Sequence, residues 1–79
     1  MLTLFYKPSC PFCQRVLGEA EHMGITLNLK DTGSDPAALE ELLEKGGQKM
    51  VPYLVDSERD VSMYESADII AYLQEHYKI

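Results

Sequence analysis

The 79-residue sequence has no tryptophan, only four prolines and few basic residues. Seven lysines and arginines stand against thirteen aspartates and glutamates, which gives a formal net charge of -6. The basic residues are scattered along the chain, so the sequence lacks the electrostatic attraction to phosphates on which nucleic-acid binding depends. We therefore expect no nucleic-acid partner.

Long apolar segments are also missing. The first apolar stretch is interrupted by Thr3 and ends at Lys7, which is too short for a signal-peptide core or a membrane span. With 46% hydrophobic and 25% charged residues, the composition is that of a globular chain with one modest core. We predict a single domain over residues 1–79 that is cytoplasmic and monomeric and contacts no membrane.

The only two cysteines, Cys10 and Cys13, lie in the short segment SCPFC. A structural disulfide between them would close a very small loop, and such loops constrain the unfolded chain least. Residues three apart on a helix have α-carbons about 5 Å apart, a separation that a disulfide tolerates. The pair therefore suits a bond that opens and closes better than a bond that staples the fold.

The spacing of apolar residues predicts four strands and three helices in the order βαβαββα. The expected strands are LTLFY (2–6), ITLNL (25–29), PYLVD (52–56) and DVSMY (60–64). The expected helices run from Pro11 to a stop at Gly24, from Pro36 after the cap Asp35 to Gly46 and Gly47, and onward from the cap Ser66 with the buried stripe Ile69, Ile70, Leu73 and Tyr77. Parallel strands need crossover helices and the last two strands can form a hairpin, so we predict an α/β fold with a four-stranded mixed sheet and three helices.

Three segments of the chain carry a family resemblance. Cys-Pro-Phe-Cys follows the first strand, MVPYL leads into the third strand, and YESADIIAYL lies at the last helix. In this order they resemble the glutaredoxin family and the closely similar N-terminal domain of glutathione transferases, over nearly the whole chain. The resemblance implies a thioredoxin-like fold of the glutaredoxin type and glutathione as the ligand.

Cys10 is the expected nucleophile. The unpaired N–H groups and the positive end of the dipole at a helix N-terminus favour the thiolate, which is the attacking form of cysteine. Cys13 lies one turn further in and is expected to be the resolving thiol. Lys7 and Arg15 either add favourable charge near Cys10 or are ordinary solvated residues.

For the middle of glutathione, the resemblance implies a cis peptide bond between Val51 and Pro52 that faces the cysteines. The Val51 backbone would then pair with the cysteinyl backbone as an added strand does. Otherwise Pro52 only begins an edge strand. Lys7 or Lys49 would bind the glycyl carboxylate, and the ring of Phe12 would cover the lip of the site.

For the γ-glutamyl end, the resemblance assigns Glu65 and Ser66. The Ser66 hydroxyl and nearby N–H groups would bind the carboxylate, and Glu65 would bind the ammonium group. Without the resemblance, Ser66 reads as a helix cap and Glu65 as a surface acid.

The chain departs from glutaredoxins in three places. Phe12 stands where tyrosine is more common, Met50 stands where threonine is, and YESAD replaces a Gly-Gly-x-Asp arrangement, which leans toward the transferase domain. A transferase also needs an all-helical domain, whereas this sequence ends at Ile79. We therefore hypothesise a dithiol glutaredoxin, an enzyme that reduces protein disulfides and glutathione mixed disulfides through Cys10 and Cys13.

Several alternatives stay open. The chain could be a glutathione-binding module like the transferase N-terminal domain, an iron–sulfur cluster carrier, or a redox-inert binding domain. Pro11, beside the first cysteine, restricts the loop that a shared cluster would need. We expect no metal site, because the remaining soft ligands, His22 and His76, are 54 positions apart (76 minus 22) and do not have zinc-finger spacing.

Overall fold

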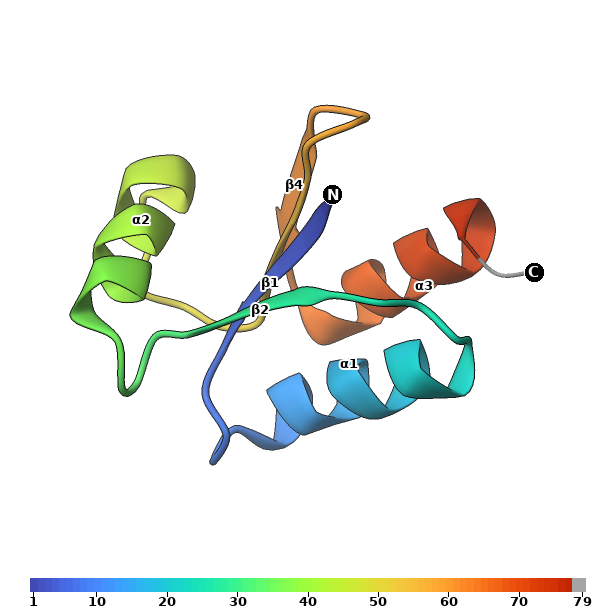
Figure 1. The fold of residues 1–79 in the computed structure, drawn as a ribbon, viewed down its shortest axis with the longest axis horizontal. Coiled ribbons are helices and arrows are strands. Elements are labelled where there is room, and N and C mark those ends of the chain that lie inside the picture. Colours follow the sequence, from blue (N-terminus) through green and yellow to red (C-terminus); the bar gives the residue numbers. More distant parts are fainter. Residues whose placement is uncertain (78–79) are drawn as a thin grey trace.

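Four strands and three helices alternate along the chain in the predicted order (Figure 1). The computed structural model describes residues 1–77. The elements are β1 (Leu2–Tyr6), α1 (Pro11–His22), β2 (Asn28–Asp31), α2 (Pro36–Gly46), β3 (Tyr53–Asp56), β4 (Val61–Tyr64) and α3 (Ser66–His76). The predicted fold class, a thioredoxin-like fold with a four-stranded mixed sheet and three helices, is confirmed.

The sheet has the strand order β2-β1-β3-β4, with β1 near its middle. β1 runs parallel to β2 and antiparallel to β3, which is antiparallel to β4. The register places Leu4 between Leu29 and Leu54. α1 is the crossover that two parallel neighbours require, whereas β3 and β4 are joined directly as a hairpin.

Side chains along β1 alternate between the two faces of the sheet, as successive residues of a strand must. Leu4 packs in one cluster with Val16 of α1 and Ile69 of α3. Phe5 packs on the opposite face with Leu42 of α2. Figure 1 shows the resulting layers, with α1 and α3 on one side of the sheet and α2 on the other. Because both faces of β1 are covered, its sequence is an almost continuous apolar run.

Local chemistry sets where the first two helices begin and end. Pro11 and Pro36 each stand in the first turn, where a missing N–H is tolerated. The carboxylate of Asp35 caps α2 by accepting a 3.0 Å hydrogen bond from the Ala37 N–H. Gly47 closes α2 with φ of 78°, a left-handed conformation that glycine adopts without steric cost.

Several predicted boundaries are wrong. β3 and β4 each begin one residue later than expected, at Tyr53 and Val61. The second strand was expected at 25–29 but spans Asn28–Asp31. The Ile25 N–H instead donates a 2.9 Å hydrogen bond to the Ala20 carbonyl, so the residues before β2 complete the end of α1. At the last helix, Ser66 is the first helical residue and Glu65 occupies the cap position without a side-chain capping bond.

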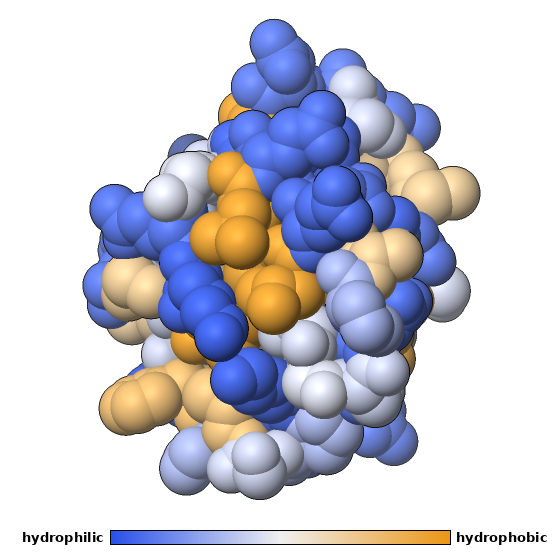
Figure 2. Space-filling model, turned by 90° about the vertical axis from the view of Figure 1, so that its left-hand side faces the viewer, coloured by the Kyte–Doolittle hydropathy of each residue, from blue (hydrophilic) through white to orange (hydrophobic). Residues whose placement is uncertain are grey.

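The surface on the α2 side is not uniformly polar. Figure 2 looks onto this face and shows an apolar patch near its centre, ringed by hydrophilic residues. Leu43 of α2 and Met50, just beyond it, are exposed large apolar side chains. Among residues 1–77, no helix combines the length and the apolar character that crossing a membrane requires.

Candidate functional site

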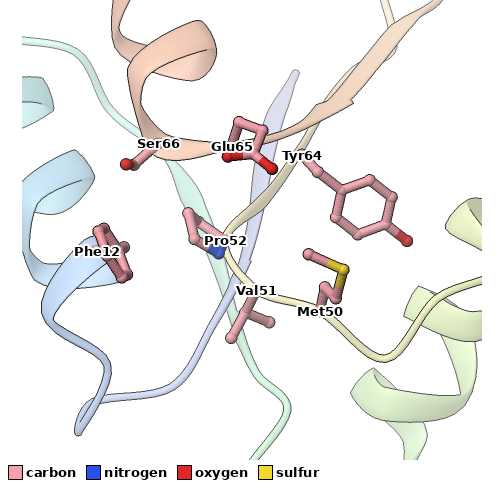
Figure 3. A pocket seen from close by; sticks show the side chains of 7 residues that line it. All are labelled: Phe12, Met50, Val51, Pro52, Tyr64, Glu65 and Ser66. Carbon is pink, nitrogen blue, oxygen red and sulfur yellow. The ribbon is translucent and has the colours of Figure 1, made fainter.

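A pocket with a volume of about 310 Å³ opens between the start of α1, the segment before β3 and the start of α3 (Figure 3). Five residues that the sequence analysis assigned to the glutathione site line it, namely Phe12, Val51, Pro52, Glu65 and Ser66. Two further lining residues, Met50 and Tyr64, were not assigned. Each of the two stands immediately before an assigned pair, and this adjacency was the sequence signal that could have found them.

The fold brings two opposite walls of this pocket together. One wall is the segment Met50–Pro52, which leads directly into β3, and its Val51–Pro52 peptide bond is cis, as the resemblance implied. The other wall is the junction of β4 and α3, because these elements follow β3 in an antiparallel hairpin. Since β3 begins at Tyr53, the backbone of Val51 lies outside the strand pairing of the sheet.

The start of α3 has an unusual backbone at Glu65. This residue has φ of 74° and ψ of 117°, a positive-φ backbone conformation that residues other than glycine rarely adopt. Such conformations cost about 1–3 kcal/mol and cluster at functional sites. Figure 3 shows the Glu65 carboxylate pointing into the space above Pro52, while Ser66 lies nearer to Phe12. Ser66 itself is buried, at 9% exposure.

Cys10 caps the N-terminus of α1, where its Sγ accepts a 3.4 Å hydrogen bond from the Cys13 N–H. Partial burial by itself raises the pKa of Cys10. The hydrogen bonds from Cys13 and from the Phe12 N–H, together with the charge of Lys7, outweigh this effect and lower the pKa below its usual value. Cys10 can therefore carry negative charge at the mouth of the helix.

Cys13 is a different kind of thiol. Its side chain has no exposed surface. Burial, together with the neighbouring Cys10 and against the opposing effect of Lys7, raises the pKa of Cys13 to about 11. Both cysteines are free thiols in this structure. The local geometry thus distinguishes one ionisable sulfur from one protonated, enclosed sulfur.

The expected cations lie beside the pocket and not in its lining. Lys7 follows β1, and its charge acts on Cys10. Its aliphatic stem passes Gly33, where a β-carbon placed on the glycine would lie 3.6 Å from Lys7 Cγ. Lys49 is exposed and immediately precedes the lining residue Met50. Neither lysine, and neither cysteine, belongs to the pocket wall. Over residues 1–77, no three histidine, cysteine or acidic side chains are grouped as a metal site would require.

A family model described as the glutathione S-transferase N-terminal domain matches residues 4–78. Among solved structures, a delta-class glutathione transferase of Nilaparvata lugens superposes with a TM-score of 0.84 and 31% identity, over 100% of this chain and 37% of that chain. Glutathione S-transferase 1-6 of Anopheles dirus species B gives a TM-score of 0.79 and 36% identity, over 95% of this chain and 35% of that chain. No curated protein matches. The chain thus spans little more than a third of the length of these solved relatives.

The hypothesis of a dithiol glutaredoxin is wrong, because the family model and these structural relatives are glutathione transferases. Cys-Pro-Phe-Cys after the first strand fits both families and could not separate them. The segment YESAD at the start of α3 was the feature that leaned toward the transferase domain. The chain belongs to the family of glutathione S-transferase N-terminal domains.

Proposed function

We propose that this chain forms the glutathione-binding site of a glutathione-transferase-type enzyme. The single observation that carries the proposal is the pocket in which the segment Met50–Pro52, the pair Glu65–Ser66 and the first turn of α1 converge. A tripeptide thiol needs an anion site, a cation site, a strip of free backbone and a place for sulfur. Ser66, Glu65 and Val51 line this pocket and are candidates for the first three, and the first turn of α1 is the candidate for the fourth.

The γ-glutamyl end of glutathione is assigned to the start of α3. Its carboxylate binds the Ser66 hydroxyl and the unpaired N–H groups of the first helical turn, where the helix dipole favours negative charge. Its ammonium group binds the Glu65 carboxylate, which points into the pocket (Figure 3). The backbone conformation of Glu65 supports this role, because residues of positive φ are concentrated at binding sites.

The rest of the tripeptide runs toward α1. The cysteinyl backbone pairs with the backbone of Val51, in the manner of an added strand. The glycyl carboxylate binds Lys49 or Lys7, and Phe12, which is 61% exposed, covers the thiol end of the site. The glutathione sulfur then lies near the start of α1, beside Cys10.

The proposed chemistry is activation of the glutathione thiol. The two neighbouring sulfurs share one negative charge, because a second anion at the same helix start is disfavoured. The Cys10 thiolate takes the proton of the bound thiol, and the glutathione thiolate attacks an electrophilic carbon. The new C–S bond forms as the bond to the leaving group breaks, and Cys10 releases its proton to solvent. Cys13 takes no part.

Calorimetric titration with glutathione tests the binding site. We expect Ser66→Ala to weaken binding by about three- to tenfold, since a hydrogen bond to a charged group is lost. Ser62→Ala, at an exposed position of the edge strand β4 and outside this pocket, is the matched control and should bind as the unaltered protein does. No heat of binding with millimolar glutathione, or equal affinity for the Ser66 variant, would overturn the proposal.

A conjugation assay with 1-chloro-2,4-dinitrobenzene tests the chemistry. Cys10→Ser should lower the rate of conjugation, whereas Cys13→Ser should leave the rate unchanged. Equal losses for the two variants would contradict the assignment of the proton acceptor.

The cellular setting belongs to the same proposal. Two free thiols fit a reducing compartment, so we place the protein in the cytoplasm. We also propose a monomer. Light scattering of the purified protein measures the second point, and a dimer mass at micromolar concentration would contradict it.

A further inference from the structure

Tyr64, the last residue of β4, forms hydrogen bonds to the backbone of Gln48 with its hydroxyl group. The hydroxyl donates a 3.0 Å hydrogen bond to the Gln48 carbonyl and accepts a 3.2 Å hydrogen bond from the Gln48 N–H. One side chain therefore satisfies both backbone groups of a residue in the loop between α2 and β3. The partners are 16 positions apart in the sequence.

The Tyr64 ring is packed on two sides. Its centroid lies 4.4 Å from that of Tyr53, in a tilted arrangement. On another side it meets Gly46, where an added β-carbon would lie 2.1 Å from the Tyr64 hydroxyl oxygen and 3.2 Å from Tyr53 Cζ. Because real β-carbons essentially never approach this closely, the site accepts only glycine at position 46 while the ring stays in place.

This contact joins the two walls of the pocket. Tyr64 directly precedes Glu65 and Ser66, and its ring extends from β4 toward α2 (Figure 3). Gln48 stands two residues before Met50, on the other wall. Between Gln48 and Met50 lies Lys49, one of the two lysines, with Lys7, that the proposed function offers to the glycyl carboxylate. The hydroxyl thus fixes the loop that carries this lysine relative to the γ-glutamyl wall.

We propose that Tyr64 is a positioning residue that makes the site selective for glutathione over γ-glutamylcysteine, the same thiol without its glycyl residue. This inference rests on the proposed glutathione site. Tyr64 hydrogen-bonds to Gln48 and so restricts the position of the neighbouring Lys49 relative to Glu65 and Ser66. Without the Tyr64–Gln48 hydrogen bonds, the loop moves freely, and the contact between the glycyl carboxylate and Lys49 adds little to the affinity. The γ-glutamyl wall is unaffected.

Calorimetric titration of Tyr64→Phe with both ligands tests the inference. This variant keeps the ring and removes both hydrogen bonds. We expect its Kd for glutathione to rise about three- to tenfold and its Kd for γ-glutamylcysteine to change less than about twofold. Hydrogen exchange at the Gln48 amide should become faster in the same variant.

Two matched controls accompany the test. Tyr72→Phe removes a tyrosine hydroxyl that binds Asp56 instead, so it should leave the ratio of the two Kd values unchanged. Gly46→Ala displaces the ring by steric overlap and should lower the selectivity as Tyr64→Phe does. Gly18→Ala, where nothing lies within 4 Å of the added carbon, should leave the selectivity unchanged.

The outcomes separate this inference from the proposed function. If the unaltered protein binds neither ligand, the glutathione site itself is refuted. If the unaltered protein prefers glutathione and both Tyr64→Phe and Gly46→Ala keep that preference, the site stands and the role of Tyr64 is refuted. Equal weakening of both ligands would show that Tyr64 only supports the fold, which also overturns the inference. If Tyr64→Phe does not fold, the comparison of Gly46→Ala with Gly18→Ala decides.

Discussion

The hydroxyl of Tyr72 donates a 2.6 Å hydrogen bond to Oδ2 of Asp56, a carboxylate with no exposed surface. The Tyr77 hydroxyl donates to the same oxygen, and the Glu58 N–H donates a 3.1 Å bond to Oδ1. Asp56 ends β3, while the two tyrosines belong to α3 and the residue that follows it. A buried charge thus joins the last helix to the sheet, and it is tolerated because its oxygens are satisfied.

Removal of one hydroxyl from this network should destabilise the protein. We expect Tyr72→Phe to lower the free energy of unfolding by about 1.5–3 kcal/mol, the usual contribution of a hydrogen bond to a charged group. Urea denaturation measures the change. Tyr64→Phe removes a hydroxyl whose bonds are exposed and should lower the same free energy by less than about 1 kcal/mol. Equal losses in the two variants would contradict the importance of the buried charge.

Stability should fall in acid because of Asp56. Burial alone raises the pKa of Asp56, but the two tyrosine hydroxyls and the Glu58 and Arg59 N–H groups outweigh it and lower the pKa below its usual value. A carboxyl whose pKa is lower in the folded state stabilises above its unfolded pKa, about 3.9, and this stabilisation disappears as the pH falls through the folded pKa. Urea midpoints between pH 6 and pH 2 should show the decline, and Asp56→Asn should flatten it.

The two cysteines should react at different rates with iodoacetamide. Cys10 is partly exposed and has a lowered pKa, whereas Cys13 is fully enclosed and has a pKa of about 11. At pH 7.5 we expect mass spectrometry to find the label on Cys10 first, at least about tenfold faster, because only the thiolate attacks. Comparable labelling of Cys13 in the folded protein would refute this assignment. Labelling in urea, where both thiols are exposed, provides the control.

Lys7 and Arg15 should differ in their effect on Cys10. The charge of Lys7 lowers the pKa of Cys10, so Lys7→Met should raise that pKa. Arg15 is not among the groups with the largest effects on that pKa, and Arg15→Met is the matched control. The pH dependence of Cys10 alkylation, or thiolate absorbance near 240 nm in a Cys13→Ser background, measures both. A larger shift of the Cys10 pKa in Arg15→Met than in Lys7→Met would show that Arg15, and not Lys7, supplies the favourable charge.

Glu65 should show a conflict between stability and binding. Glycine at position 65 removes the cost of its positive φ, about 1–3 kcal/mol, at the expense of about 0.5–1 kcal/mol of chain entropy. Glu65→Gly should therefore stabilise the fold in urea denaturation while it weakens glutathione binding through the lost carboxylate. Glu65→Gln keeps the strain and loses only the charge, so it should weaken binding without a gain in stability. A destabilised glycine variant would argue against the strain.

Most helix ends could be predicted because the residues that set them act locally. Pro11, Asp35 with Pro36, and Gly47 each act through their own torsions or through a contact a few residues away. The start of β2 could not be predicted from the alternation of ITLNL. Ile25 completes the end of α1, and pairing with β1 begins only at Asn28. The partner strand decides which residues of an apolar segment pair with it.

The candidate site, like the helix and strand boundaries, was predicted only in part from the sequence. Phe12, Val51, Pro52, Glu65 and Ser66 were predicted because they belong to recognisable segments, and all five line one pocket. The partnership of Tyr64 with Gln48 left no sequence signal, since its hydrogen bonds join residues 16 positions apart. The expected glutaredoxin activity failed for a related reason. Cys-Pro-Phe-Cys is a local motif that two families share.

The amino-acid sequence by itself determined the order of the elements, the mixed four-stranded sheet and the cysteine at the start of α1, because periodicity and capping depend on near neighbours. Only the tertiary structure decided where β2 begins, that Met50 and Tyr64 also line the pocket, and how its two walls are joined. Burial and long-range contacts arise when distant segments pack, and the chain has neither before it folds.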